Sequence, residues 1–156
     1  MECTVSCLED FPLWLSLARE VEPLFGPMAD VPEFQSALQA AINEGRALCI
    51  RDTDTAGACQ MGGGVIFDKN TNEILWLVVS QVLRGRGAGR LLLNTVIERM
   101  DPTRPIRVQT YDGSVEAGMP ARHLYINMGF QDLCDGGRNP AGFPTVIMER
   151  PVFQAA

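Results

Sequence analysis

Two stretches near the N-terminus repeat apolar residues every three or four positions, which is the period of an amphipathic helix. In residues 8–26 the repeating positions are Leu13, Leu17, Val21 and Leu24. In residues 31–45 they are Phe34, Leu38, Ala41 and Ile42. Pro32 suits a first helical turn, whereas Gly26 with Pro27, and Gly45, are typical of helix ends. The pattern therefore predicts two N-terminal helices.

The middle of the chain changes to strand-like patterns. Residues 46–52 and 62–68 are predicted strands, and DKNTNE, residues 68–73, reads as a hairpin turn. The turn leads into an unbroken apolar run from Ile74 to Val79, which predicts a buried strand. After a glycine-rich turn, a third helix is predicted from the buried stripe Leu92, Leu93, Val96, Ile97 and Met100. Asp101 with Pro102 closes this helix.

The last third of the chain adds a strand, a short helix and two more strands. Residues 105–111 form the strand and residues 119–129 the helix. Strands are predicted at 130–134 and 145–150, separated by a loop at 135–144. This order of elements indicates a mixed α/β or α+β domain with one central sheet. Because no internal repeat or long linker divides the chain, residues 1–156 are expected to form a single domain.

Composition excludes several classes of protein. Hydrophobic residues make up 46% and charged residues 21%, as in ordinary soluble globular proteins. The longest apolar run, Ile74 to Val79, is far shorter than the roughly 20 residues of a membrane span. The N-terminus has no basic segment, so a secretory signal is not expected. A net charge of −6 argues against a general nucleic-acid surface.

The cysteines indicate neither a disulfide framework nor a zinc site. There are 5, irregularly spaced and without a C-x-x-C pair, and the single histidine, His123, has no cysteine near it in sequence. Cys49 lies in an apolar run and is expected to be a small core residue. No metal is therefore predicted, and a reducing cytoplasm is the expected location.

The turn RGRGAGR, residues 84–90, gathers positive charge and glycine between a buried strand and a helix. The first N–H groups of a helix lack intrahelical partners, and with the helix dipole they favour an anion such as phosphate. Glycine lets the backbone approach a phosphate closely. Because the rest of the chain is acidic, a small anion is favoured over a long one. The alternative is a tight turn whose arginines only make it soluble.

Two common phosphate motifs do not fit this turn. A Walker loop needs G-x-x-x-x-G-K-[ST], and a dinucleotide fingerprint needs a third glycine one residue later than Gly89. The pattern that remains is R-x-x-G-x-G, from Arg84 to Gly89. A second segment, ARHLYINMGF at residues 121–130, has the form A-x-x-x-Y-x-x-x-G-F. With both segments in this order, the chain resembles the GNAT superfamily of acyl-CoA-dependent N-acetyltransferases over roughly residues 46–150.

The resemblance implies a fold and a co-substrate. The fold would be a mixed, mostly antiparallel sheet, splayed between two strands and flanked by about four helices. The co-substrate would be acetyl-CoA, whose pyrophosphate is held by the backbone of Arg84, Gly85, Arg86, Gly87, Ala88, Gly89 and Arg90. Its pantetheine arm would lie along Val78, Val79 and Ser80. Homodimers are common in the family, so a homodimer is also an expectation.

The resemblance also implies roles in catalysis. Tyr125 matches the family's tyrosine near the coenzyme sulfur and, as a phenol with pKa near 10, can act as general acid; the alternative is a packing residue. Glu73 lies where several members carry a catalytic base, but a solvated hairpin glutamate is an equal alternative. A water chain or an amine of low pKa would then replace it. The Val79 N–H is a candidate to polarise the acetyl carbonyl, whereas His123 is expected at the surface or in packing.

The acceptor is the least readable part. The resemblance places residues 22–28 and 138–144 at its walls, although both segments also serve as simple helix and strand ends. Acidic side chains that are candidates to attract a cationic amine are Glu22, Asp30, Asp112 and Glu116. The leading hypothesis is an N-acetyltransferase acting on a small-molecule or peptide amine. The alternative is a non-catalytic acyl-CoA-binding sensor, and a nucleotide-binding domain of another class fits the motif spacing less well.

Overall fold

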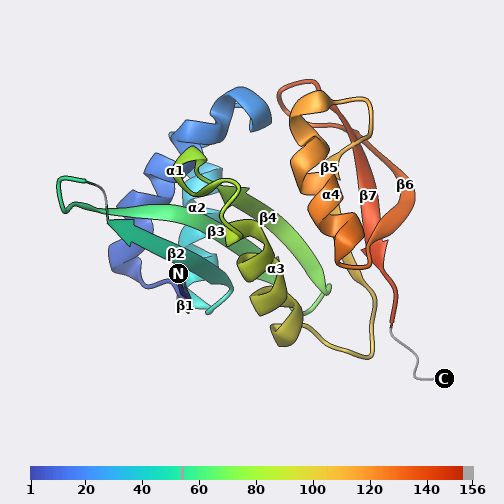
Figure 1. The fold of residues 1–156 in the computed structure, drawn as a ribbon, viewed down its shortest axis with the longest axis horizontal. Coiled ribbons are helices and arrows are strands. Elements are labelled where there is room, and N and C mark those ends of the chain that lie inside the picture. Colours follow the sequence, from blue (N-terminus) through green and yellow to red (C-terminus); the bar gives the residue numbers. More distant parts are fainter. Residues whose placement is uncertain (54, 153–156) are drawn as a thin grey trace.

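The computed structural model describes residues 1–53 and 55–152, which fold around one seven-stranded sheet (Figure 1). The strand order is β1-β2-β3-β4-β5-β7-β6. Neighbouring strands are antiparallel except for β4 and β5, which are parallel. In the described ranges no helix is both long and apolar enough to cross a membrane. The sheet is therefore mixed and mostly antiparallel, as expected.

The first half of the chain supplies four strands and the two predicted helices. Its elements are β1 (Cys3–Val5), the 3-10 helix η1 (Leu8–Asp10), α1 (Phe11–Phe25), α2 (Pro32–Asn43), β2 (Ala47–Thr53), β3 (Cys59–Asp68) and β4 (Glu73–Val79). Gly26 ends α1 with a φ of 91°, and Gly45 follows α2 with a φ of 71°. These are left-handed values that favour glycine, so both predicted helix ends are confirmed.

The second half begins with the glycine turn and ends at the other edge of the sheet. Its elements are the 3-10 helix η2 (Gln81–Leu83), α3 (Ala88–Arg99), β5 (Ile106–Tyr111), the 3-10 helix η3 (Glu116–Gly118), α4 (Met119–Asn127), β6 (Gln131–Arg138) and β7 (Pro144–Arg150). Figure 1 shows α1 and α2 on one face of the sheet and α3 and α4 on the other. The mixed α/β domain with four helices is confirmed.

Two strands depart from the prediction. β1 was not predicted; it spans only Cys3–Val5 and exists by pairing with β2. β6 continues to Arg138, although a loop was predicted from residue 135. β6 is an exposed edge strand with polar residues and glycines and no alternating pattern, and register shifts interrupt its pairing with β7. Both strands are stabilised by a neighbouring strand, which a local pattern does not reveal.

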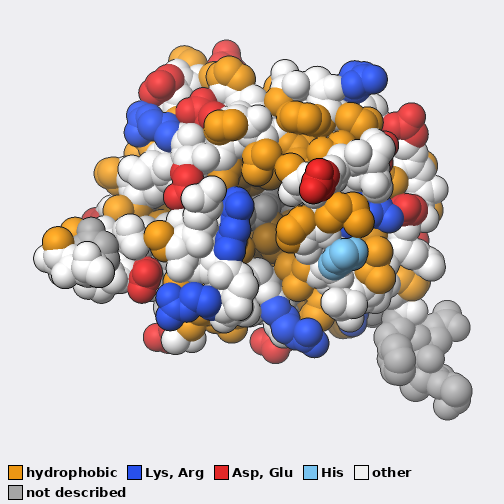
Figure 2. Space-filling model, turned by 45° about the horizontal axis from the view of Figure 1, so that its top comes forward, with side chains coloured by type: hydrophobic (Ala, Val, Ile, Leu, Met, Phe, Trp, Pro, Cys, Tyr) orange, Lys and Arg blue, Asp and Glu red, His pale blue; other side chains and the backbone are white. Residues whose placement is uncertain are grey.

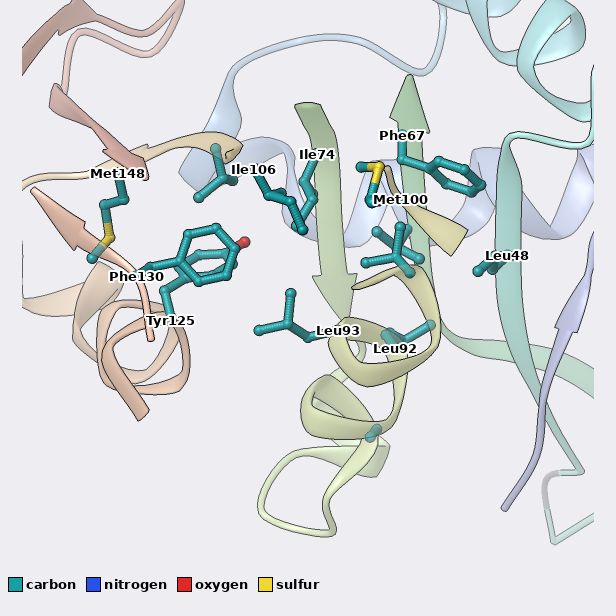
Figure 3. Packing of buried hydrophobic residues seen from close by; sticks show 14 of the residues in the cluster. Leu48, Phe67, Ile74, Leu92, Leu93, Met100, Ile106, Tyr125, Phe130 and Met148 are labelled. Atoms are coloured by element: carbon teal, nitrogen blue, oxygen red, sulfur yellow. The ribbon is translucent and has the colours of Figure 1, made fainter. Parts of the chain in front are cut away.

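The core has one apolar cluster on each face of the sheet. On the face of α1 and α2, the fully buried Trp14 packs with Leu17, Leu38 and Ile42. On the other face, Leu92, Leu93 and Val96 of α3 pack against the strands, and Tyr125 and Phe130 join them from the α4 side (Figure 3). The predicted stripe of the third helix is confirmed as buried at Leu92, Leu93, Val96 and Met100, and its fifth member, Ile97, is half-buried.

β4 and β5 pair at one end only. Their register consists of Glu73 opposite Arg107 and Ile74 opposite Val108. Beyond these pairs the strands diverge, as Figure 1 shows. A β-bulge accompanies the divergence: Ile74 pairs with Phe67 and Trp76 with Ile66 of β3, so Leu75 between them has no partner. A bulge bends its strand and increases the local twist, which turns β4 away from β5.

Asn72 lies just before β4, next to the end where β4 and β5 are paired. It is fully buried and adopts a φ of 58°, the left-handed region. Its side-chain amide donates to the carbonyls of Asp101, Arg104 and Pro105 at 3.1 to 3.2 Å, and its side-chain oxygen accepts from Asp101 N at 3.0 Å. Its carbonyl accepts from Arg107 N at 3.2 Å. Asn72 therefore connects the start of β4 to the loop that leads into β5.

Replacing Asn72 with alanine should destabilise the fold markedly. The change leaves several buried carbonyls without their donor and keeps a side chain in the left-handed region, so we expect a loss of about 3 kcal/mol. Asn70→Ala is the matched control, because that residue is exposed and its side chain makes no assigned hydrogen bond in the described chain. Urea denaturation measures both. Equal stability of the two variants would contradict this role of Asn72.

Candidate functional site

A cavity of about 790 Å³ fills the space between the diverging strands β4 and β5. Its wall includes residues of α1, β4, the glycine turn, the start of α3, β5, α4 and the loop between β6 and β7. Figure 2 shows this face of the molecule hollowed near its middle, with hydrophobic side chains on one wall and a basic side chain on the other. The predicted glycine turn and the predicted tyrosine thus meet in one cavity.

The glycine turn presents unbonded backbone donors to this cavity. Gly85 and Gly87 have φ values of 74° and 85°, and a Cβ at either would meet no atom within 4 Å. Gly87 is the N-cap of α3, and its carbonyl accepts from Leu91 N at 3.0 Å. Within the described chain, no hydrogen bond is assigned to the amides of Gly85, Gly87, Ala88, Gly89 and Arg90. This open cradle suits an anion.

Gly89 has a different role from the other two glycines of the turn. A Cβ at Gly89 would lie 3.1 Å from Cδ2 of Leu124, so its small size lets α3 pack closely against α4. Among the arginines, Arg84 and Arg90 line the cavity, and Arg84 Nε donates to the Val79 carbonyl at 3.3 Å. Arg86 is exposed and is not among the lining residues.

The exposed edge of β4 carries the expected free backbone groups. Ser80 N donates to the Gly62 carbonyl at 2.8 Å, so the neighbouring pair, Val79 opposite Gly63, is a non-hydrogen-bonded pair. In such a pair both residues turn their N–H and C=O away from the partner strand. The Val79 N–H therefore points from β3 toward the cavity side. Val78 and Val79 both line the cavity.

Ser80 directly follows β4 and is the N-cap of η2. It is buried, it does not line the cavity, and its hydroxyl donates to Glu20 Oε1 of α1 at 2.8 Å. The other carboxylate oxygen of Glu20 accepts from Gln81 N at 3.0 Å. Glu20 thus connects α1 to the segment that enters the glycine turn. The predicted contact of Ser80 with the pantetheine arm stays a prediction.

Tyr125 lines the cavity from α4. Its ring is only 3% exposed and packs edge-to-face on Phe130, with ring centroids 5.4 Å apart. Figure 3 shows its hydroxyl pointing away from α4 toward β4. No hydrogen-bond partner for the hydroxyl is found among the described residues. Burial raises the pKa of this hydroxyl above its ordinary value, because the charged phenolate is poorly solvated there.

Glu73 lies at the end of β4 that is still paired with β5, away from the cavity between the two strands. It is the first residue of β4, opposite Arg107, and it is not among the cavity-lining residues. The Arg107 guanidinium pairs instead with Glu149, at 2.9 Å. No described lining residue is Asp or Glu; the charged side chains in the wall are Arg84, Arg90 and Arg138. A role of Glu73 as base therefore stays a prediction and would need an intervening group.

The two predicted wall segments meet on the far side of the cavity. Asn139 donates to the carbonyl of Leu24 and to the hydroxyl of Tyr111, both at 3.3 Å. A Cβ on Gly26 would lie 3.1 Å from Cβ of Pro140, so the end of α1 packs directly on the loop between β6 and β7. Burial raises the pKa of Tyr111 above its ordinary value. This wall is closely packed and mostly apolar.

Several site residues could not be recognised from the sequence. Tyr111 and Trp76 line the cavity but read as ordinary strand residues, and Glu20 reads as a solvated helix residue. His123 is exposed and does not line the cavity, consistent with the surface position expected for it. In the part of the chain that is described, no three His, Cys, Asp or Glu side chains are grouped to hold a metal ion.

Solved structures with this fold include several acetyltransferases. An acetyltransferase of the GNAT family from Bacillus cereus has a TM-score of 0.72 and 17% identity, over 98% of both chains. The ribosomal-protein-S18-alanine N-acetyltransferase of Escherichia coli has a TM-score of 0.67 and 16% identity, over 99% of this chain and 96% of that one. The NatC complex bound to Gag peptide and CoA has a TM-score of 0.71 and 19% identity, over 98% of this chain and 100% of that one.

At these identities the likeness shows a shared fold. Comparison with curated protein sequences gives no significant match. Family membership comes from the sequence itself, because the family model for the acetyltransferase (GNAT) domain matches residues 30–151, well over half of the chain. The chain belongs to the GNAT family of acetyltransferases and is therefore an acetyl-CoA-dependent acyltransferase.

Proposed function

We propose that this protein is an N-acetyltransferase that transfers the acetyl group of acetyl-CoA to a primary amine, with Tyr125 as the proton donor. One observation carries the proposal. The unbonded amides of the glycine turn, the free edge of β4 and the Tyr125 hydroxyl all border the same cavity. These are an anion cradle, a backbone edge for an extended chain and a buried acid.

The residues present fit acetyl-CoA as substrate. The unbonded amides of the glycine turn would hold the pyrophosphate, with Arg84 and Arg90 adding charge that is not lost at any working pH. The Arg86 amide donates instead to the Leu83 carbonyl at 3.3 Å. The free backbone groups of β4 near Val79 would hydrogen-bond the amides of the pantetheine arm, much as an added strand does. Because β4 diverges from β5, the arm can enter between them without breaking an existing ladder.

The proposed reaction is a direct transfer. The amine nitrogen forms a bond to the acetyl carbon, the carbon–sulfur bond breaks, and the sulfur leaves with the electron pair of that bond. Tyr125 gives its proton to this sulfur, so CoA leaves as the thiol. The nitrogen loses one proton, which returns to the tyrosinate directly or through water. The Val79 N–H would stabilise the carbonyl oxygen while it carries negative charge. The products are the N-acetylated amine and CoA.

The wall of the cavity favours an amine that is easily deprotonated. With no carboxylate among the described lining residues, no side-chain base stands beside the acceptor. At about pH 7.4, freeing a lysine-like amine of its proton costs about 4 kcal/mol, whereas an α-amino group costs about 1 kcal/mol or less. Water in the cavity would accept the proton in either case. The E. coli structure is named for acetylation of an alanine, and NatC was solved with a peptide, which supports a peptide amine as the acceptor. A small-molecule amine stays the other candidate.

The missing side-chain base also favours a second candidate, a non-catalytic acyl-CoA-binding sensor. Such a protein would bind acetyl-CoA at the same turn without turning over any amine.

All 5 cysteines are free thiols, which is compatible with the cytoplasmic location that is part of the proposal. Homodimer formation stays a prediction.

Gly87→Ala should weaken the binding of acetyl-CoA at least about tenfold. The new methyl group would occupy the open cradle, and the left-handed φ of 85° adds backbone strain. Gly45→Ala is the matched control, since Gly45 also has a positive φ and open space around its Cβ but lies at the end of α2. Calorimetric titration measures both affinities. Equal affinity in the two variants would remove the pyrophosphate site from this turn.

Tyr125→Phe should lower kcat by about 10² to 10³ and change the affinity for acetyl-CoA less than about threefold. The ring and its contact with Phe130 are kept, so only the proton donor is lost. The rate at which the CoA thiol is released, with an amine that the wild type acetylates, gives kcat, and calorimetric titration gives the affinity for acetyl-CoA. Full activity in this variant would rule out the proton-donor role. Normal binding with no turnover in the wild type, for any amine, would instead favour the sensor.

The kcat/KM of the transfer should rise with pH and should not fall between about pH 7 and 9. Burial raises the pKa of Tyr125, so the donor keeps its proton up to at least about pH 10. As pH rises, the acceptor amine loses its proton and becomes reactive. We therefore expect kcat/KM to rise to a plateau set by the pKa of the amine. A fall between about pH 7 and 9 would show that the proton donor is a more acidic group than Tyr125.

A further inference from the structure

The acceptor end of the cavity is bordered by a continuous series of aromatic rings. Phe143 contacts Tyr111 with ring centroids 5.3 Å apart, and Tyr111 stacks on Phe25 at 5.8 Å. Phe25 contacts Trp76 edge-on at 6.4 Å, and Trp76 contacts Phe34 at 5.9 Å. Of these rings, Phe25, Trp76 and Tyr111 line the cavity, together with Leu24 and Val21 of α1. The group beside the reacting amine would therefore lie against apolar surface.

The acids of this region are held elsewhere. Glu20 binds Ser80 and Gln81, and Glu22 accepts from Met28 N at 2.9 Å. Asp30 pairs with Arg19 at 3.0 Å. Neither these residues nor Asp112 and Glu116, which the sequence offered as attractors of a cationic amine, are among the residues that line this cavity. Glu116 lines an adjoining hollow instead, together with Phe143. The charges that do line the cavity are the arginines Arg84, Arg90 and Arg138.

A second positive charge on the acceptor would be poorly accommodated here. It would lose water without gaining a carboxylate. It would also meet the like charge of Arg138, the lining arginine that is not assigned to the pyrophosphate. Aromatic faces attract cations, but this attraction is weaker than that of a buried carboxylate partner and is opposed by the charge of Arg138. An uncharged apolar group gains from the same surface, because its burial removes apolar area from water.

From this wall we infer that the acceptor is a primary amine attached to an apolar or aromatic group that carries no further positive charge. The inference rests on the proposed acetyl transfer and narrows its substrate. Two sources offer this chemistry: the N-terminus of a peptide whose first residue is apolar, and a small apolar amine. Lysine side chains beside other cations, and polyamines, are disfavoured.

Matched pairs of amines test the inference on the wild-type protein at saturating acetyl-CoA. The peptide pair is Leu-Gly-Gly amide and Lys-Gly-Gly amide, whose α-amines have similar pKa values, with α-acetylation identified by mass spectrometry. The small-molecule pair is 2-phenylethylamine and 1,4-diaminobutane. We expect kcat/KM at least tenfold higher for the apolar member of the pair that is used. Activity on the peptides alone identifies a peptide N-terminus, and activity on the small amines alone identifies a free amine.

The contrary outcomes separate this inference from the acetyltransferase proposal. Equal or better use of the cationic members would overturn the apolar acceptor and leave acetyl transfer in place. Acetyl-CoA binding without acetylation of any of the four amines would overturn both and favour the sensor.

A substitution in the wall provides a second test. Leu24→Glu adds a carboxylate to the end of α1 at a half-buried lining position. We expect the preference for the leucine peptide over the lysine peptide to fall at least tenfold, with the affinity for acetyl-CoA unchanged. Leu133→Glu is the matched control, because Leu133 is 46% exposed on β6 and does not line the cavity. An unchanged preference in Leu24→Glu, with thermal stability near that of the control, would contradict the inference.

Discussion

The incomplete pairing of β4 and β5 is the constraint on which the rest of the structure depends. Parallel strands in contact normally continue their ladder, but here the ladder stops after Ile74 and Val108. The bulge at Leu75 turns β4 away, and the buried amide of Asn72 keeps the two strands together where they start. A sheet can tolerate such an opening only where something satisfies or solvates its free backbone groups. The cavity lies in this opening.

The opening also explains how groups from both faces of the sheet reach one place. α1 packs on one face, and α3 and α4 pack on the other, so an unbroken sheet would separate them. Where β4 and β5 diverge, Tyr125 from α4 and Phe25 from α1 border the same cavity. Glu20 adds a direct connection between the faces, because it holds the segment between β4 and the glycine turn through Ser80 and Gln81. Hydrogen bonds thus join α1 to the segment that enters the glycine turn.

The charge in the cavity is one-sided, and this shapes the chemistry that the residues can support. Arginines and backbone amides favour the phosphates of the co-substrate, and the buried tyrosine keeps its proton because its phenolate would be poorly solvated. No carboxylate is among the described residues that line the cavity, so an amine bound there would have no side-chain base beside it. A site of this kind works best on an amine that gives up its proton readily and brings little charge of its own.

The sequence by itself determined the features that are encoded locally. Pro32, Gly26 and Gly45 mark helix ends because their backbone preferences act at their own positions. The glycine turn and the tyrosine segment were recognisable for the same reason: each is a short pattern with fixed spacing, and both belong to the family that matches residues 30–151.

Only the tertiary structure decided which residues from distant parts of the chain contact these locally encoded segments. β1 and the extension of β6 exist through neighbouring strands, and Glu73 lies at the closed end of the opening because of where β4 and β5 pair. In the wall formed by Leu24, Tyr111 and Asn139, Asn139 contacts one residue 115 positions away and another 28 positions away along the chain. Contacts of this kind depend on the packing of whole elements, so they become visible only once the sheet has formed.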